Sequence, residues 1–189
     1  FYAVPYNSML GTADNLAYYG VAFNIYSYLL NICTAGFPFA IATLIAKYST
    51  RGDYQTSLLI KKLSASLMTC FGFGMMIIVI LFSSPLAALV MPDEGDSVKT
   101  MQMVLILISF ALFFVPLLSS IRGFYQGLKH MEVYALSQVL EQVARVAFLL
   151  SASAIAVYAL HTDQVWALYF GVISTSISAI LAIMHLKLY

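Results

Sequence analysis

The feature that most constrains this chain is the spacing of its charged residues, which gather in short segments between long apolar stretches. Only 9% of the 189 residues are charged and 62% are hydrophobic, whereas a soluble domain carries about 25% charged residues. About 20 apolar residues in a helix cross the hydrocarbon core of a bilayer. Five stretches are long enough: Leu16–Ala46, Leu63–Met91, Thr100–Ile121, Val133–Leu160 and Val165–Leu186. We therefore predict an all-α, polytopic membrane protein with five complete transmembrane helices. Phe1–Leu10 is too short to span and is interpreted as the end of a sixth.

The basic residues between these stretches fall mostly on one side of the predicted membrane. One side holds Lys47, Arg51, Lys61, Lys62, Arg122, Lys129 and Lys187, and the other holds only Lys99. Loops rich in lysine and arginine stay in the cytoplasm during insertion. The asymmetry therefore predicts that loops 47–62 and 122–132 are cytoplasmic and that loops 92–99 and 161–164 are external.

The stretch Val133–Leu160 is interrupted by a polar stripe of Gln138, Glu141 and Arg145. Their spacing of three and four residues puts them on one face of a helix. A charged side chain at the centre of a membrane helix costs about 2.5–3.5 kcal/mol, so this face must meet other helices or a water-filled cavity. Two interpretations remain open: the stripe lines a cavity that handles substrate or ions, or it is an ion pair that fixes helix packing.

Two further segments contain residues that alter helix geometry or packing. Gly36 and Pro38 lie in the middle of the first stretch, where proline removes a backbone hydrogen bond and kinks the helix. This break is either static or a bend used in alternating access. Gly123 and Gly127 form a GxxxG motif that allows close helix approach. The neighbouring Arg122 either reaches the headgroups from this packing segment or contacts substrate.

Several classes of function have no visible basis in the sequence. The three histidines are scattered without metal-ligand spacing, and no catalytic Ser/His/Asp grouping or phosphate-binding loop is present. The net charge of +1 and the lack of a basic tail give no argument for nucleic acid. We therefore predict no metal, no cofactor, no enzymatic activity and no nucleic-acid partner.

Two strings resemble a known family. TAGFPFAIATLIAKYSTRGDY (Thr34–Tyr54) is similar to the second-helix signature of the polysaccharide exporter and flippase family. FFVPLLSSIRGFYQGLKHMEVYALSQVLEQVARV (Phe113–Val146) is similar to its fourth and fifth helices. The closest branch contains the Gram-positive type lipid II flippases and the stage V sporulation protein B group. These belong to the multidrug/oligosaccharidyl-lipid/polysaccharide (MOP) superfamily.

The resemblance implies a two-lobed MATE-like transporter of the bacterial plasma membrane that works by alternating access. Residues 1–189 would form a partial N-terminal lobe, from the end of helix 1 through helix 6, of a longer chain. The missing C-terminal lobe would be its partner within that chain. The family's helix 1 usually carries an arginine implicated in binding the lipid pyrophosphate, and this arginine would precede Phe1.

The resemblance and the polar stripe together give the leading functional hypothesis. The protein would move a lipid-linked saccharide precursor, lipid II or a related undecaprenyl-linked glycan, from the inner to the outer leaflet for cell-wall or polysaccharide biosynthesis. Its partners would be this substrate and membrane lipids. Arg145 is the leading substrate-binding candidate, because arginine pairs well with a pyrophosphate.

Two alternatives remain. A cation-coupled multidrug exporter of the same superfamily would need an intramembrane carboxylate that is free to titrate. Glu141 is the only carboxylate inside a predicted span, and Arg145 beside it should hold it charged. A non-transporting membrane scaffold is the second alternative.

Overall fold

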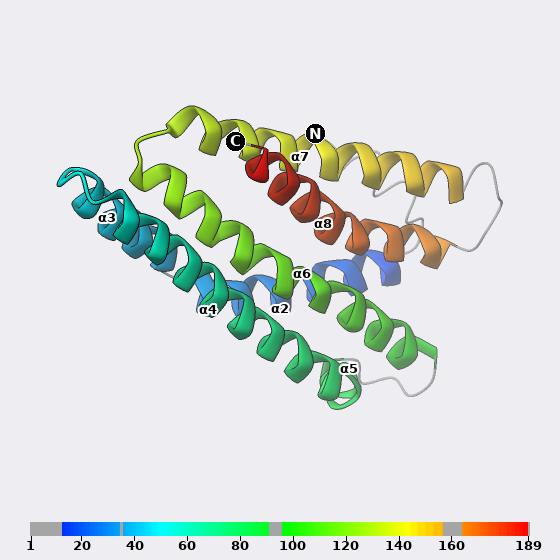
Figure 1. Ribbon diagram of the computed structural model, residues 1–189. Coiled ribbons are helices and arrows are strands. Elements are labelled where there is room, and N and C mark those ends of the chain that lie inside the picture. Colours follow the sequence, from blue (N-terminus) through cyan, green and yellow to red (C-terminus); the bar gives the residue numbers. More distant parts are fainter. Residues whose placement is uncertain (1–12, 35, 91–95, 157–163, 189) are drawn as a thin grey trace.

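The computed structural model describes residues 13–34, 36–90, 96–156 and 164–188 (Figure 1). Every regular element in these residues is a helix. In chain order they are α2 (Ala13–Thr34), α3 (Phe37–Ser49), α4 (Tyr54–Leu81), α5 (Ser83–Val90), α6 (Asp96–Gly127), α7 (Met131–Ala154) and α8 (Gln164–Lys187). The all-α prediction is therefore confirmed. The predicted segments Phe1–Leu10, 92–95 and 161–163 lie outside the described residues.

Five spans in the described residues are long and apolar enough to cross a membrane, in agreement with the predicted number. They are Leu16–Ser49, Tyr54–Leu81, Ser97–Gly127, Met131–Ala154 and Val165–Lys187. The chain is a multi-pass membrane protein. The first span contains both α2 and α3, and the short helix α5 follows α4 after a break at Phe82. The prediction of one continuous span over Leu63–Met91 was therefore wrong at its outer end.

Helix α6 is the centre of the bundle and contacts each of the other described helices. Figure 1 shows it between α4 and α8, with α2 and α3 on the far side. Leu105, Ile108, Leu112 and Leu118 of α6 are almost completely buried. Both apolar clusters of the bundle are built on this helix. A side chain on α6 therefore faces protein rather than lipid around much of the helix.

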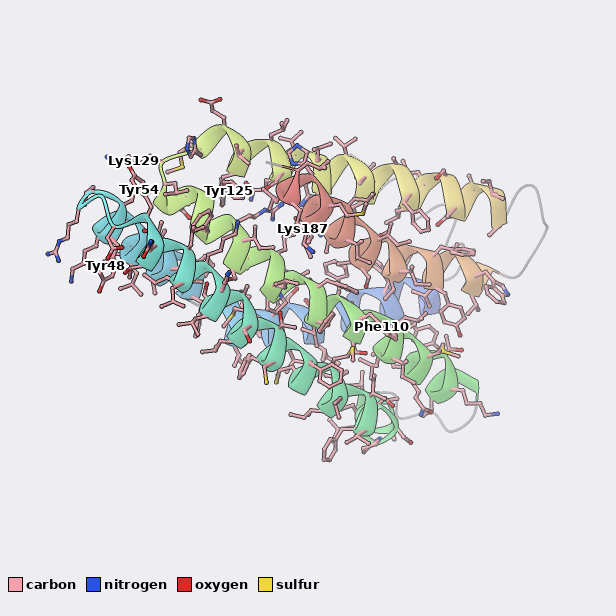
Figure 2. All side chains as sticks on the ribbon, viewed as in Figure 1. Tyr48, Tyr54, Phe110, Tyr125, Lys129 and Lys187 are labelled. Atoms are coloured by element: carbon pink, nitrogen blue, oxygen red, sulfur yellow. The ribbon has the colours of Figure 1, made fainter. Side chains whose placement is uncertain are left out.

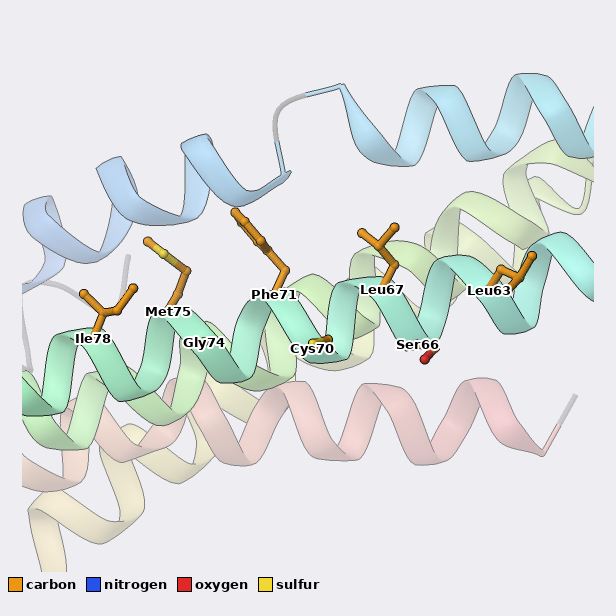
Figure 3. Close-up of a pocket in the computed structure, with 8 residues that line it drawn as sticks. All are labelled: Leu63, Ser66, Leu67, Cys70, Phe71, Gly74, Met75 and Ile78. Carbon is orange, nitrogen blue, oxygen red and sulfur yellow. The ribbon is translucent and has the colours of Figure 1, made fainter.

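The break between α2 and α3 lies at the residues that the sequence indicated. Gly36 has φ 76°, a left-handed conformation that favours glycine, and it precedes the first turn of α3. Pro38 lies in that first turn, where its missing amide N–H costs no intrahelical hydrogen bond. Figure 3 shows the resulting gap between the two helical segments in the upper part of the view. The chain therefore has a discontinuous helix inside its first span.

The connections are shorter than the predicted loops 47–62, 92–99 and 122–132. Helix α3 continues to Ser49 and α4 begins at Tyr54, so the first connection is a turn of residues 50–53. Helix α6 contains residues 96–127, so residues 96–99 are also helical and the α6–α7 connection is only residues 128–130. Charged residues mark where a helix leaves the hydrocarbon, but the helix continues past that level because its backbone hydrogen bonds remain intact. Asp53 caps the N-terminus of α4 and so determines where this helix begins. Its carboxylate accepts a hydrogen bond from the backbone N–H of Thr56 at 3.0 Å.

Candidate functional site

Three charged side chains inside the bundle form one connected group, which we term the arginine–glutamate cluster: Arg122, Glu141 and Arg145. The Oε2 atom of Glu141 lies 2.8 Å from Nη1 of Arg122, and its Oε1 atom lies 2.7 Å from Nη2 of Arg145. Each carboxylate oxygen therefore has a guanidinium partner of its own. The exposed fractions of the three side chains are only 13%, 8% and 16%, respectively.

The cluster joins two helices at membrane depth. Glu141 and Arg145 are four residues apart on α7, which places them on one face of that helix. Arg122 comes from the last part of α6 and also donates from Nε to the hydroxyl of Ser137 at 2.9 Å. Glu141 lies ~15 Å along the helix axis from the first residue of α7 at ~1.5 Å per residue, in the interior of a helix that is long and apolar enough to cross a membrane.

Gln138 does not lie in the cluster, although the sequence put it on the same stripe. Its side chain is exposed, whereas Ser137 is fully buried and contacts Arg122. The reason is rotation about the helix axis: Ser137, Glu141 and Arg145 are spaced by four residues, and Gln138 is turned by about 100° from Ser137. Two of the predicted stripe residues, Glu141 and Arg145, therefore lie on the buried polar face of α7, and Ser137 rather than Gln138 is the third polar residue on that face.

The electrostatic balance of the cluster is positive, because two guanidiniums share one carboxylate. Within the described residues, Nη2 of Arg122 and Nε of Arg145 are buried without a hydrogen-bond partner. The phenol of Tyr26 on α2 is also buried and lies within electrostatic range of Glu141 and Arg145. A group with unused buried donors and an excess positive charge is suited to receive an anion.

A small cavity of about 180 Å³ connects this cluster to the break in the first span. It is lined by Thr34, Pro38, Val115, Ser119, Arg122, Gln126 and Tyr134. The volume corresponds to about six water molecules at ~30 Å³ each. The N-terminus of α3 lies at this cavity, where Pro38 belongs to its first turn. Since a helix N-terminus carries a partial positive charge, it adds to the positive potential beside Arg122.

Gly123 and Gly127 lie on a different face of α6, against α3. A Cβ atom placed on Gly123 would lie 2.8 Å from the carbonyl oxygen of Pro38. A Cβ atom on Gly127 would lie 2.6 Å from Cβ of Ile45 and 2.7 Å from the carbonyl oxygen of Ala42. The GxxxG motif is thus the place where the backbones of α3 and α6 come closest, as such motifs allow.

Sequence spacing could not connect Arg122 to Glu141, because the two residues belong to different helices. The sequence indicated this contact only indirectly. Ser137, Glu141 and Arg145 are polar residues on one face of a helix, and such a face requires a polar partner on a neighbouring helix. Arg122 is the basic residue of α6 that lies in the half of the helix next to the α6–α7 connection. An antiparallel pair joined by three residues brings residues on either side of the connection together.

A larger hollow of about 770 Å³ lies along one side of α4, away from the cluster (Figure 3). All of its lining residues come from this one helix, and they are apolar apart from Ser66 and Cys70. Leu63, Leu67 and Phe71 among them are exposed. This hollow has the character of a membrane-helix surface and offers no charged group for chemistry. The described residues also contain no group of His, Cys, Asp or Glu that could hold a metal ion.

Known proteins resemble the chain over its whole length. Residues 2–188 match a family described as "Polysaccharide biosynthesis protein". The chain is 34% identical over 194 residues to the lipid II flippase MurJ of Bacillus subtilis (strain 168), which covers 100% of this chain and 35% of that protein. It is 33% identical over 113 residues to stage V sporulation protein B of the same organism, covering 59% of this chain and 20% of that protein. The chain thus spans about a third or less of the length of these relatives.

The fold has a counterpart among solved structures. It is similar to the outward-facing conformation of a multidrug resistance MATE family transporter of the MOP superfamily, with a TM-score of 0.68. The two sequences are 17% identical, over 96% of this chain and 41% of that chain, so this likeness concerns the fold. Together with the family match, the relatives confirm the resemblance seen in Thr34–Tyr54 and Phe113–Val146: the chain belongs to the family described as "Polysaccharide biosynthesis protein".

Proposed function

We propose that the protein is a flippase that moves a lipid-linked saccharide with a phosphate-bearing head group across the bacterial plasma membrane. The observation that carries this proposal is the arginine–glutamate cluster, in which two arginines share one glutamate at membrane depth. The physical task of such a flippase is to shelter a charged head group while its polyprenyl tail stays in lipid. A partly buried guanidinium suits this task, because its planar donors match a phosphate.

The assignment of each residue follows from its contacts. Arg145 and Arg122 would bind the phosphate groups, with Glu141 keeping both side chains extended while no substrate is bound. The N-terminus of α3 would add positive potential at the break near Gly36 and Pro38. That break would also let α2 and α3 tilt separately during alternating access. Gly123 and Gly127 would keep α3 attached to α6 during the movement.

The finer features of the proposal are supported by the relatives and by the charge pattern. The similarity to a lipid II flippase favours lipid II or a related undecaprenyl-linked glycan as substrate. Residues 1–189 would form part of the N-terminal lobe, completed by a second lobe of the same chain. The turns around residues 50–53 and 128–130 would face the cytoplasm. The role is transport, without cofactor or catalysis.

A cation-coupled multidrug exporter is the less favoured alternative. Such an exporter needs a carboxylate that can bind and release its cation during the cycle. Both oxygens of Glu141 already accept from guanidinium groups. The excess positive charge of the cluster fits an anionic substrate better than a cationic drug. A non-transporting scaffold would have no use for unpaired buried arginine donors beside a cavity.

Genetic complementation tests the proposal. The full-length protein is expressed in a bacterial strain depleted of its own lipid II flippase, as wild type, Arg145→Ala and Arg51→Ala. We expect wild type and Arg51→Ala to restore growth, because Arg51 is exposed in the turn after α3. Arg145→Ala should fail at equal protein levels. Normal growth with Arg145→Ala would refute the assigned role of this residue, and failure of wild type would refute lipid II as substrate.

A further inference from the structure

A third concave surface lies over α6, between α4 and α8, and we term it the α4–α8 groove. Its volume is about 650 Å³. Its floor is apolar and follows α6 from Leu117 through Ile121 to Phe124, with Leu128 just after the end of that helix and Ala65 on the α4 wall. This floor extends for ~16 Å at ~1.5 Å per residue, about the thickness of one leaflet of a ~30 Å core. Figure 1 shows α6 lying between the two flanking helices here.

The open end of the groove is basic. Lys61 and Lys62 line it from α4, and Lys187 lines it from α8. The ammonium of Lys61 reaches across the floor, with Nζ 4.4 Å from the ring centroid of Phe124. No Asp or Glu is among the described residues that line the groove. The described lining of the groove therefore carries basic side chains without a carboxylate, unlike the arginine–glutamate cluster, where Glu141 balances part of the positive charge.

The walls of the groove are held in place by a hydrogen bond. The hydroxyl of Tyr125 on α6 donates to the backbone carbonyl of Leu186 on α8 at 2.8 Å. This bond fixes the end of α8 so that Lys187 stays at the rim. Figure 2 shows Tyr125 and Lys187 near each other at this end of the bundle. The outer face of α4 is apolar and exposed at Leu59 and Leu63, which is typical of a lipid-facing helix.

We propose that the α4–α8 groove binds one anionic phospholipid of the surrounding membrane. The phosphate of the head group would lie between Lys61, Lys62 and Lys187, and an acyl chain would lie on the apolar floor. The match is twofold: an amphiphile has its charge at one end, as the groove does, and basic pockets between membrane helices attract anionic lipid head groups. This lipid is a bound component of the membrane, distinct from the transported substrate, and its site is separate from the cavity at Arg122.

Native mass spectrometry of the full-length protein tests this assignment. The protein in neutral detergent is titrated with dioleoyl phosphatidylglycerol or with dioleoyl phosphatidylcholine. We expect one tightly held phosphatidylglycerol and no comparable binding of phosphatidylcholine. In the triple variant Lys61→Gln/Lys62→Gln/Lys187→Gln the affinity should fall by about fivefold for each lysine removed.

The matched control is Lys47→Gln/Arg51→Gln/Lys129→Gln, which removes the same charge from exposed positions outside the groove. It should bind phosphatidylglycerol as wild type does. Ala65→Phe narrows the groove from its α4 wall without changing charge and should also weaken binding. An equal loss in both triple variants would overturn the proposal, because it would show general charge attraction. Equal binding of phosphatidylcholine, or displacement of the lipid by inorganic phosphate at millimolar concentration, would overturn it as well.

Discussion

Two faces of α6 contact their neighbouring helices in opposite ways: one face holds Gly123 and Gly127, and the other holds Arg122. Gly123 and Gly127 face α3 with no side chain between the helices, and a Cβ atom on either would lie less than 3 Å from an atom of α3. Arg122 faces α7 with a long charged side chain that ends on Glu141 and Ser137. The first contact is dry and close, and the second is polar and lined by a cavity.

These two contacts show that close helix packing and buried charge can occupy separate faces of one membrane helix. Apolar side chains gain little by leaving lipid for a protein interface, so helices associate through small residues in close contact or through polar pairs. The contact at Gly123 and Gly127 depends on small residues in close contact and carries no functional group. The contact between α6 and α7 depends on a polar pair, but it contains one arginine more than its glutamate can neutralise. A purely structural pair would need only one arginine, and our proposal of an anion-binding role rests on the second.

Removing the shared carboxylate of Glu141 should lower the stability of the protein more than any other change considered below. Glu141→Gln leaves two mostly buried guanidiniums without a counter-charge. Loss of one member of a buried ion pair costs about 3–5 kcal/mol, so we expect a strongly lowered melting temperature of the full-length protein in detergent. The double variant Glu141→Gln/Arg145→Gln removes one positive charge as well and should regain most of this stability. A single variant as stable as wild type would show that the cluster contributes nothing to folding.

The glycine contact should break at a smaller cost. Gly127→Ala places a Cβ atom 2.7 Å from the carbonyl oxygen of Ala42, so α3 and α6 must move apart. Overpacking of this kind costs about 1–3 kcal/mol in unfolding free energy. The control is Gly74→Ala on α4, where a Cβ atom would meet nothing within 4 Å. Both variants can be compared by thermal unfolding, and equal stabilities would argue against a close α3–α6 contact.

The helix break can be tested separately from both contacts. Gly36→Ala forces a residue with a Cβ atom into a left-handed conformation at φ 76°. We expect a loss of about 1–2 kcal/mol from backbone strain alone, since no neighbouring atom lies within 4 Å of the added carbon. Gly20→Ala, in the interior of α2 with equally open space, should instead stabilise by about 0.5–1 kcal/mol, because alanine favours a helix more than glycine does. If the two variants unfold at the same temperature, Gly36 is not needed for the break.

The smallest expected effect concerns the start of α4. The hydroxyl and backbone N–H of Thr56 donate to Asp53 and lower the pKa of its carboxyl below the ordinary 3.8. Because the pKa is lower in the folded state, the ionised carboxylate stabilises the protein at pH values above the ordinary pKa. This stabilisation is lost as the pH falls from the ordinary pKa through the folded-state pKa. Asp53→Asn keeps a capping side chain but should remove this pH dependence. Unfolding temperatures of the two proteins between pH 3 and pH 6 should therefore differ in slope, and parallel curves would contradict the assignment.

The sequence was most informative about features that depend on one helix alone. The uncharged stretches predicted five spans, and Gly36 with Pro38 marked the break in the first of them. Spacing along α7 brought Glu141 and Arg145 onto one face. What spacing could not predict is how two helices are rotated relative to each other, and this rotation decides that Ser137 and not Gln138 meets Arg122.

The helix ends were also beyond the reach of the charge pattern. The cost of inserting a charge depends on the depth in the bilayer, so charged residues locate the membrane boundary. Lys61 and Lys62 lie at that boundary but within α4, which begins at Tyr54. The true start of this helix is set by a capping hydrogen bond of Asp53, a local interaction that hydropathy does not measure.

Transport by Arg145→Gln is the most direct test of whether the arginine–glutamate cluster binds the head group of the substrate. The substitution reduces the cluster from two positive charges to one, and it leaves the 2.8 Å pair of Arg122 and Glu141 in place to support folding. Full-length wild type and variant are reconstituted in vesicles, and movement of a fluorescent polyprenyl-diphosphate saccharide between leaflets is followed. We predict a variant that folds and unfolds like wild type but moves the substrate at least about tenfold more slowly, as expected from one lost charge-assisted contact of about 1.5–3 kcal/mol. Transport at the wild-type rate would contradict the account and leave the cluster as a structural ion pair.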